Sequence, residues 1–397
     1  MLKNISISLI FLILKSILSL YLFKVITDTT LPSTYAPYGV SVVFIGLLTT
    51  IGSVGLGPAL VRSKYISVKK INTYIIFSLI LGLGLGLGLV LSADSIQQLL
   101  KIPDSKLYIQ LVAPIVIVKL VSMIYEAVLQ RKLKIREIVN IDFYSFIVIH
   151  FLLQIVVLKS GIEIYWLIIC VFIEEIIKLS LYKAKSETPF STSYDFKKIK
   201  EDIGFSGVLT INRIINYINS QLDKLYVSNQ LNPTDFSGYS RVFQLINFPI
   251  TIIGQLFDKV IYPILCDRLR ANQSAYNIIT IGVLLLLGFV GTIICYYLGS
   301  YIEKLFLNGE WSDYIDVYYL LIFIIPVRLV DRYSSVVLNA IGRPLVRTWS
   351  QLIFISSLII GLIFVGDELK HIALISIFSY SLSALVSITY LVIKYEK

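Results

Sequence analysis

Long apolar runs recur along almost the whole sequence, and they constrain the fold more than any other feature. A helix needs about 20 apolar residues to cross the hydrocarbon core of a bilayer. The runs lie near residues 5–26, 36–58, 72–93, 107–130, 138–158, 162–182, 204–226, 236–263, 277–299, 314–338, 348–366 and 371–393. The sequence therefore predicts an all-α polytopic membrane protein with about twelve transmembrane helices.

The composition excludes a water-soluble fold. Hydrophobic residues make up 56% of the chain and charged residues 15%, whereas soluble domains average about 45–50% and about 25%. The three cysteines are widely separated and show no metal-ligand spacing, so we expect no metal and no cofactor. The first run has no small-residue cleavage site, which indicates a retained helix rather than a signal peptide.

The charges of the connections indicate the orientation. Alternate connections carry basic clusters, such as those at 62–70 and 131–136, whereas the opposite set carries isolated lysines such as Lys101 and Lys159. Lysine and arginine near helix ends stay on the cytoplasmic side. Both termini are therefore predicted to be cytoplasmic. The net charge of +10 then reflects topology and gives no support to nucleic-acid binding, for which basic residues cluster on one folded domain.

The longest polar connection, residues 184–203, divides the runs evenly. It predicts an N-terminal six-helix lobe at 1–183 and a C-terminal six-helix lobe at 204–397. Many transporters consist of two such halves with a substrate site between them near the middle of the membrane. We therefore expect a two-lobe transporter.

Glycines alternate with leucines in the third run. Gly82 and Gly86 are four residues apart, as are Gly84 and Gly88, and this spacing of small residues lets helices approach closely. A phosphate-binding loop would need a preceding strand and a following Lys-Ser or Lys-Thr pair, and neither is present. We predict that both glycine pairs are helix-packing sites.

Basic residues inside the runs are the strongest functional signal. A charge at the bilayer centre costs about 2.5–3.5 kcal/mol on insertion scales, and such charges normally face a bundle interior or a wet cavity. Lys15, Lys119 and Arg213 have no carboxylate within one turn of the same helix, and three further arginines are candidates for the same cationic cavity: Arg241, Arg328 and Arg332. A cavity lined by excess cations indicates an anionic substrate. The alternative is that Glu126, Asp142 or Glu174 neutralises these cations from a neighbouring helix.

The acidic residues have simpler interpretations. Glu174 and Lys178 lie four residues apart and Arg328 and Asp331 lie three apart, so each pair is expected to neutralise itself on one helix. We interpret His150 as a hydrogen-bonded helix contact, with a proton carrier as the alternative.

Short motifs in the second run and in the second half of the chain suggest a family. They are Tyr38-Gly39, Gly55–Arg62, Asn212-Arg213, Asp223-Lys224, Gly238–Arg241, Pro249, Tyr262-Pro263 and Leu338–Pro344. In these motifs and in its twelve-run plan the sequence resembles the Wzx-type polysaccharide-repeat flippases. Multidrug-and-toxin exporters and the lipid II flippase belong to the same superfamily. The resemblance covers most of the chain and implies a MATE-like fold working by alternating access.

The resemblance also implies a cargo and a location. The cargo is an undecaprenyl-pyrophosphate-linked oligosaccharide, moved from the cytoplasmic to the periplasmic leaflet of the bacterial inner membrane. Proton or sodium coupling would use Glu174, Asp223 or Asp331, and a polysaccharide polymerase and a chain-length regulator are candidate partners. Two alternatives stay open. They are a multidrug exporter, whose cavity should be acidic, and a membrane polymerase or glycosyltransferase, which typically needs a long periplasmic loop or paired carboxylates.

Overall fold

The computed structural model describes residues 2–62, 67–188, 195, 197–257, 261–271, 278–365 and 368–395, and these residues form helices joined by turns. The chain separates into two compact units, residues 1–218 (unit 1) and residues 219–397 (unit 2). Helix α9 (Lys197–Gln230) begins in unit 1 and ends in unit 2. The fold class predicted from the apolar runs is confirmed.

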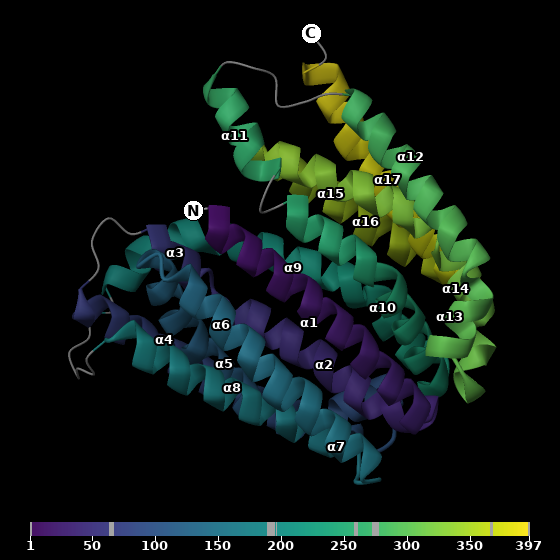
Figure 1. Cartoon of the computed structure of the whole chain (residues 1–397), viewed down its shortest axis with the longest axis horizontal. Coiled ribbons are helices and arrows are strands. Elements are labelled where there is room, and N and C mark those ends of the chain that lie inside the picture. The colour runs from purple at the N-terminus through teal and green to yellow at the C-terminus, as the bar shows by residue number, and fades with distance from the viewer. Residues whose placement is uncertain are drawn as a thin grey trace. The chain divides into compact units, whose positions relative to one another are not determined.

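Within its described residues, unit 1 contains ten helical elements, most of them labelled in Figure 1. They are α1 (Leu2–Thr29), α2 (Pro32–Ser53), α3 (Leu56–Arg62), α4 (Val68–Leu100), α5 (Ser105–Arg131), α6 (Ile135–Ser145), the π-helical segment η1 (Phe146–Leu153), α7 (Gln154–Lys159), α8 (Tyr165–Ser186) and the first part of α9. The fifth predicted run is therefore one continuous helical segment whose middle is π-helical.

Unit 2 contains the rest of α9 and the later helices. These are α10 (Pro233–Leu256), α11 (Tyr262–Arg270), α12 (Ile278–Tyr297), α13 (Gly299–Phe306), the 3-10 segment η3 (Gly309–Tyr314), α14 (Ile315–Leu321), α15 (Ile324–Ala340), α16 (Pro344–Val365) and α17 (Leu369–Tyr395).

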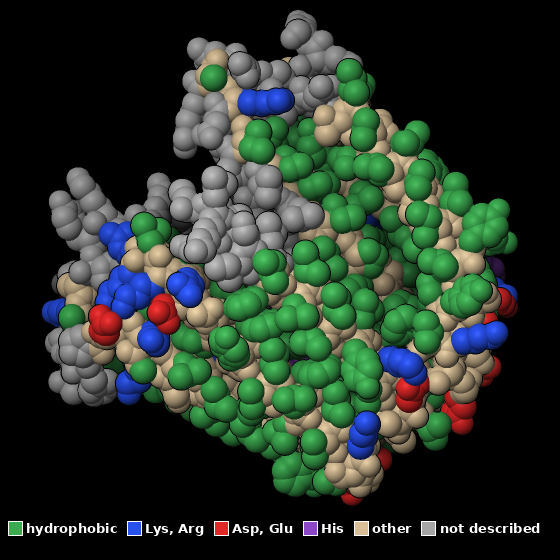
Figure 2. Space-filling view, viewed as in Figure 1, with side chains coloured by type: hydrophobic (Ala, Val, Ile, Leu, Met, Phe, Trp, Pro, Cys, Tyr) green, Lys and Arg blue, Asp and Glu red, His purple; other side chains and the backbone are tan. Residues whose placement is uncertain are grey.

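Each of the twelve predicted runs coincides with a helix or a helical series. Among the described residues, seven segments are long and apolar enough to cross a membrane by length and composition: Pro32–Val61, Val68–Leu100, Ser105–Arg131, Ile135–Lys159, Ile278–Tyr297, Leu345–Phe364 and Leu369–Lys394. Hydrophobic side chains cover the helix flanks seen in Figure 2, whereas the charged side chains gather near helix ends. This distribution is typical of a multi-pass membrane protein.

Helix α5 is the centre of unit 1 and packs against α2, α3, α4 and α8. One of its faces, with Ile124 and Val128, packs on α3 and α4. A second face, with Val121 and Tyr125, packs on α6 and α8. Residues three and four apart lie on one face of a helix, so two such stripes let α5 bury its apolar residues on two sides at once.

The glycine repeat of α4 contributes to this packing with only one of its two pairs. A β-carbon added to Gly82 would lie 3.0 Å from Cα of Ile117 on α5, and one added to Gly86 would lie 3.4 Å from a side-chain atom of Ala113. A β-carbon at Gly84 or Gly88 would meet nothing within 4 Å. The prediction of close packing is confirmed for the first pair and wrong for the second. On α4 the two pairs are offset by two residues, which is about 200° of helix rotation, so the second pair faces away from α5.

Helix α15 is the centre of unit 2 and packs against α10, α12 and α17. Its residues Val330, Tyr333 and Val337 join Leu284 of α12 and Leu391 of α17 in a buried cluster. Among the twelve predicted runs, α5 contains the fourth, and α15 forms the larger part of the tenth, whose first part is α14. Each central helix therefore has the same place in its predicted six-helix half.

The predicted linker at 184–203 lies partly outside the described residues. Helix α8 continues to Ser186 and α9 begins at Lys197, so both ends of the predicted linker are helical. The boundaries of the two predicted six-helix lobes stay a prediction.

Candidate functional site

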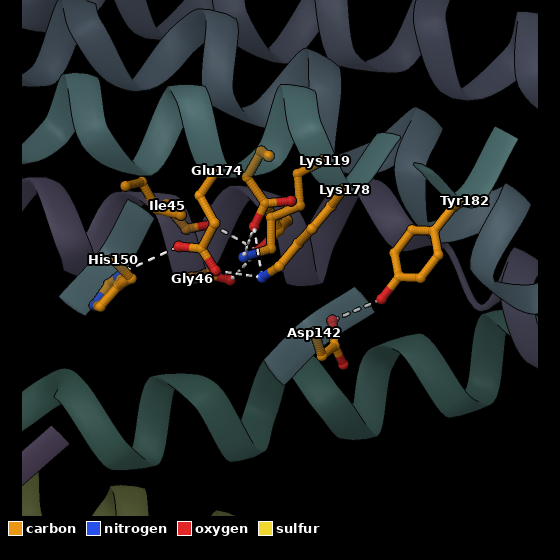
Figure 3. A network of polar contacts seen from close by, with 10 residues as sticks. Ile45, Gly46, Lys119, Asp142, His150, Glu174, Lys178 and Tyr182 are labelled. Atoms are coloured by element: carbon orange, nitrogen blue, oxygen red, sulfur yellow. Dashed lines mark hydrogen bonds and ion pairs between the residues drawn. The ribbon is translucent and has the colours of Figure 1, made fainter. Parts of the chain in front are cut away.

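A network of ion pairs lies inside unit 1, with two adjacent carboxylates of α8 at its centre. Lys178 lies one turn after Glu174 on α8, and its ammonium group is 2.6 Å from the Glu174 carboxylate. The ammonium group of Lys119, on α5, lies 3.3 Å from the Glu175 carboxylate. Nδ1 of His150, on η1, lies 3.0 Å from the other oxygen of Glu174. Figure 3 shows these side chains converging from three helical segments. The expected Glu174–Lys178 pair is confirmed.

Burial explains why these groups are paired. The Glu174 and Glu175 side chains are 6% and 7% exposed, and burying a carboxylate is expensive unless it is paired and hydrogen-bonded. Lys119 therefore has a carboxylate partner on a neighbouring helix. This arrangement corresponds to the neutralised alternative that the sequence left open, with Glu175 as the partner.

Lys15 of α1 belongs to the same region but has a different partner. Its ammonium group lies 4.9 Å from the centre of the Phe146 ring, and no carboxylate of the described residues lies within ion-pair distance. Asp142 of α6 is nearby and accepts a hydrogen bond of 2.6 Å from Tyr182 of α8 (Figure 3). A cation–π contact stabilises an ammonium group by about 0.5–2 kcal/mol, which offsets only part of the cost of placing it in a membrane protein.

Arg213 lies on the part of α9 that belongs to unit 1. Its side chain is exposed, and the described residues provide no ion pair or hydrogen bond to it. It is the predicted cavity residue most available to a ligand.

Unit 2 contains a buried carboxylate that is held by hydroxyl groups. Tyr239 of α10 donates to Asp223 of α9 at 2.9 Å, and Ser376 of α17 donates to it at 3.5 Å. Asp223 is 1% exposed. No cation of the described residues lies within 4 Å of this carboxylate, in contrast to Glu174 and Asp331.

Two cations share one aromatic ring next to this carboxylate. The ammonium of Lys224 lies 4.3 Å and the guanidinium of Arg328 lies 5.7 Å from the centre of Phe243. Arg328 also lies 4.7 Å from the centre of the Tyr380 ring. Lys224 donates to the backbone carbonyl of Ser220. The structure therefore places a second cation beside Arg328, and the sequence analysis did not count it among the cations of the cavity.

Asp331 of α15 pairs with an arginine in the first turn of α16. Arg347 of α16 binds both oxygens of Asp331, at 2.5 and 2.8 Å. The expected Arg328–Asp331 pair is wrong, because this two-oxygen contact occupies the carboxylate and Arg328 lies against aromatic rings instead. A bidentate arginine–carboxylate pair combines two charge-assisted hydrogen bonds. Arg328, three residues before Asp331 on the same helix, makes no such contact with it.

The remaining two predicted arginines occupy different surroundings. Arg241 of α10 is 1% exposed, and its guanidinium lies 5.6 Å from the Trp311 ring. Arg332 of α15 is exposed and runs along α10, where its Nε would lie 3.1 Å from a β-carbon added to Gly254. Arg241 is therefore part of the packed interior of unit 2.

The structure thus brings together some of the predicted residues and separates others. Lys119 and Glu174 belong to the ion-pair network of unit 1, and Lys15 lies in the same region against Phe146. Asp223 and Arg328 lie near each other in unit 2. Sequence reasoning included Tyr239 only as part of the Gly238–Arg241 motif and gave it no role at the site, and it missed Ser376, because a single hydroxyl residue in an apolar run carries no pattern. No group of three potential metal ligands occurs among the described residues.

Comparison with known proteins gives matches over much of the chain. A family model described as "Polysaccharide biosynthesis protein" matches residues 31–316. An "uncharacterized membrane protein in cps region" of Klebsiella pneumoniae is 23% identical over 227 residues, which are 55% of this chain and 47% of that protein. The lipopolysaccharide biosynthesis protein WzxC of Escherichia coli (strain K12) is 21% identical over 335 residues, 81% of this chain and 67% of that protein. The chain thus spans about half the length of the Klebsiella protein.

Solved structures show the same fold at low identity. The lipid II flippase MurJ in an inward closed conformation superposes with a TM-score of 0.74 at 15% identity, covering 96% of this chain and 87% of that one. An inward-facing multidrug resistance MATE family transporter gives a TM-score of 0.67 at 13% identity, covering 94% and 93%. The expected MATE-like architecture is confirmed. Because the family model matches most of its length, the chain belongs to the polysaccharide biosynthesis protein family.

Proposed function

We propose that the protein is a flippase for undecaprenyl-pyrophosphate-linked oligosaccharide repeat units. It moves them by alternating access from the cytoplasmic to the periplasmic leaflet of the bacterial inner membrane, with both of its own termini in the cytoplasm. The family membership and the MurJ-like fold support this proposal. So does the match to WzxC.

Arg213 is the observation that carries the proposal. It is an exposed arginine in an apolar run, without an ion-pair partner among the described side chains. A guanidinium binds phosphate oxygens through two parallel hydrogen bonds, and a bare charge in a membrane segment costs about 2.5–3.5 kcal/mol. An anionic headgroup that contacts Arg213 would offset this cost during transport.

The membrane potential favours the proposed direction. Each elementary charge gains about 2.3 kcal/mol per 100 mV when it moves with the potential. A pyrophosphate headgroup with two negative charges therefore gains about 4–5 kcal/mol per 100 mV on leaving an inside-negative cell. The lipid tail can stay in the bilayer while the headgroup passes along the cations.

Resetting of the carrier is assigned to a bound proton or sodium ion. Of the three candidate carboxylates, Asp223 fits this role best, because hydroxyl groups rather than cations hold it. Glu174 and Asp331 are each bound to a basic side chain. An incoming cation would therefore displace no ion pair at Asp223.

Export of repeat units in a strain that lacks its own flippase tests the proposal. Replacing Arg213 by Ala should abolish export while the protein stays in the membrane at the normal level. Arg136→Ala is the matched control, because Arg136 is also exposed but lies at the start of α6. Normal export by Arg213→Ala would remove this residue from the mechanism, and absence of export by the unmodified protein would contradict the function.

A multidrug exporter is the second candidate, favoured by the MATE-like fold and by the buried carboxylates in both units. Export of cationic dyes by the unmodified protein, without export of repeat units, would establish it instead. A membrane polymerase or glycosyltransferase has no such support, because the solved structures of this fold named above are a flippase and a transporter.

A further inference from the structure

Two cations inside unit 2, Lys224 of α9 and Arg328 of α15, have no carboxylate partner among the described residues. Elsewhere in the chain, Lys119, Lys178 and Arg347 each lie within ion-pair distance of a carboxylate. Charges inside membrane-spanning segments normally pair with one another or face a wet cavity. Lys224 and Arg328 are therefore suited to bind an anion that does not belong to the chain.

The carboxylate nearest to them along the chain, Asp223, does not neutralise both cations. It is 1% exposed, and the hydroxyl groups of Tyr239 and Ser376 donate hydrogen bonds to it. Its single negative charge can balance at most one of the two positive charges beside it. This part of unit 2 therefore carries an excess positive charge.

Aromatic rings hold the Arg328 guanidinium while most of its donors lack an acceptor in the described part of the chain. The guanidinium lies 4.7 Å from the centre of the Tyr380 ring and 5.7 Å from that of Phe243. A guanidinium has five N–H donors, and the described acceptors include only the Tyr380 hydroxyl, at 3.5 Å. The Tyr380 ring in turn packs on Phe354 of α16, with 4.4 Å between the ring centres. Arg328 is half-buried, so its remaining donors can bind two oxygens of one phosphate group.

Lys224 places a second positive charge at the Phe243 ring. Its ammonium group lies 4.3 Å from the centre of that ring, and it donates to the backbone carbonyl of Ser220 and, at 3.2 Å, to the side-chain amide oxygen of Gln221. Both acceptors are neutral, so the charge of Lys224 stays uncompensated by them. Lys224 is only 7% exposed. A charge in a low-dielectric interior acts on its neighbours more strongly than in water, so Lys224 can attract an anion bound to Arg328 without touching it.

We propose that Phe243 and Tyr380 hold Lys224 and Arg328 as one phosphate-binding site of unit 2. Arg328 binds the phosphate oxygens, and Lys224 supplies a second positive charge. The two rings are positioning residues, because the face of an aromatic ring attracts a cation without neutralising it. The inference rests on the proposed function and deepens it: the ligand is the phosphate of the lipid headgroup, and these residues are its contact in unit 2.

Competition between two lipids tests this site. The purified full chain is mixed with equal amounts of a polyprenyl-diphosphate-linked sugar and of uncharged polyprenol, and native mass spectrometry gives the ratio of the two bound forms. We expect Arg328→Gln to lower the ratio of diphosphate lipid to polyprenol by about 10- to 100-fold, as the loss of hydrogen bonds to a charged group does. Lys224→Gln should lower it less, because its ammonium acts without contact. Lys304→Gln, which changes an exposed lysine of α13, is the matched control and should leave the ratio unchanged.

The ring variants test the positioning role. Tyr380→Phe keeps the ring and loses only the long hydrogen bond of 3.5 Å, so its ratio should stay near that of the unmodified protein. Tyr380→Leu removes the ring and should lower the ratio. Equal ratios for these two variants would overturn the positioning role, and a normal ratio in Arg328→Gln would overturn the site. Misfolding removes both lipids together, so the polyprenol distinguishes it from loss of the site, and Lys224→Gln carries the test if Arg328→Gln does not fold.

Inorganic pyrophosphate, added as a competitor, distinguishes a lipid headgroup from a free anion. At a concentration equal to that of the diphosphate lipid it should leave this lipid bound, and displacement of the lipid would overturn the headgroup assignment. Failure of this inference differs from failure of the flippase. Normal export together with a normal ratio in Arg328→Gln would overturn the site alone, whereas an unmodified chain that binds no diphosphate lipid would contradict the proposed function as well.

Discussion

Removing the arginine that binds Asp331 should destabilise unit 2 more than removing both partners. Arg347 reaches from α16 to α15 and binds both carboxylate oxygens, at 2.5 and 2.8 Å. The two side chains are 16% and 11% exposed. Arg347→Ala therefore leaves a carboxylate that the described residues compensate only with the Ser383 hydroxyl at 3.5 Å.

The expected cost follows from this burial. Breaking a buried ion pair by removing one partner costs about 3–5 kcal/mol, whereas replacing both partners by apolar residues of similar volume is often neutral or stabilising. Arg347→Ala should lower the free energy of unfolding by about 3–5 kcal/mol. The double variant Arg347→Met with Asp331→Leu should recover most of this loss, because no buried charge is left without a partner.

Detergent-induced unfolding followed by tryptophan fluorescence measures both variants. Trp311 is 1% exposed and lies in unit 2, so its emission reports the loss of packing there. Equal stability of Arg347→Ala and the unmodified protein would refute the reasoning. So would a double variant that is less stable than Arg347→Ala.

Two further predictions concern packing and pH. Gly288→Ala should destabilise the protein by about 1–3 kcal/mol through overpacking, because its new methyl group would collide with the backbone of Pro326. The control is Gly282→Ala on the same helix, whose methyl group would meet nothing within 4 Å and which should be neutral or stabilising by up to about 1 kcal/mol. Equal melting temperatures for the two variants would contradict this prediction. Lys134 donates to Glu187 at 3.0 Å and lowers the pKa of this exposed carboxyl. This contact therefore stabilises the α5–α6 turn at neutral pH and is lost as the pH falls through the lowered pKa. Hydrogen exchange in the turn should accelerate in acid, and an unchanged acid response in Glu187→Gln would exclude Glu187 as its origin.

Sequence patterns predicted the helices well, because each helix that crosses a bilayer must be apolar over its whole length. The same reasoning explains the wrong prediction for Gly84 and Gly88. A spacing of four residues shows that two glycines share a face, but it does not show which face meets a neighbour. In α4 the face with Gly82 packs on α5, and the face with Gly84 is open.

Side-chain pairing was predicted only where it is local. Glu174 and Lys178 are one turn apart, and the structure pairs them. Lys119 pairs with Glu175 from another helix, and no spacing in the sequence encodes that contact. Likewise, Arg347 of α16 pairs with the buried carboxylate of Asp331 on α15, and no spacing in the sequence encodes that contact.

The potential dependence of headgroup translocation tests the central claim most directly. The purified chain would be reconstituted with a pyrophosphate-linked oligosaccharide lipid, and the rate of headgroup transfer would be measured under imposed potentials. We expect transfer away from the negative side to accelerate as the potential grows, and Arg213→Ala to transfer no faster than protein-free vesicles. A rate that equals that of protein-free vesicles, or that is indifferent to the sign of the potential, would contradict the account.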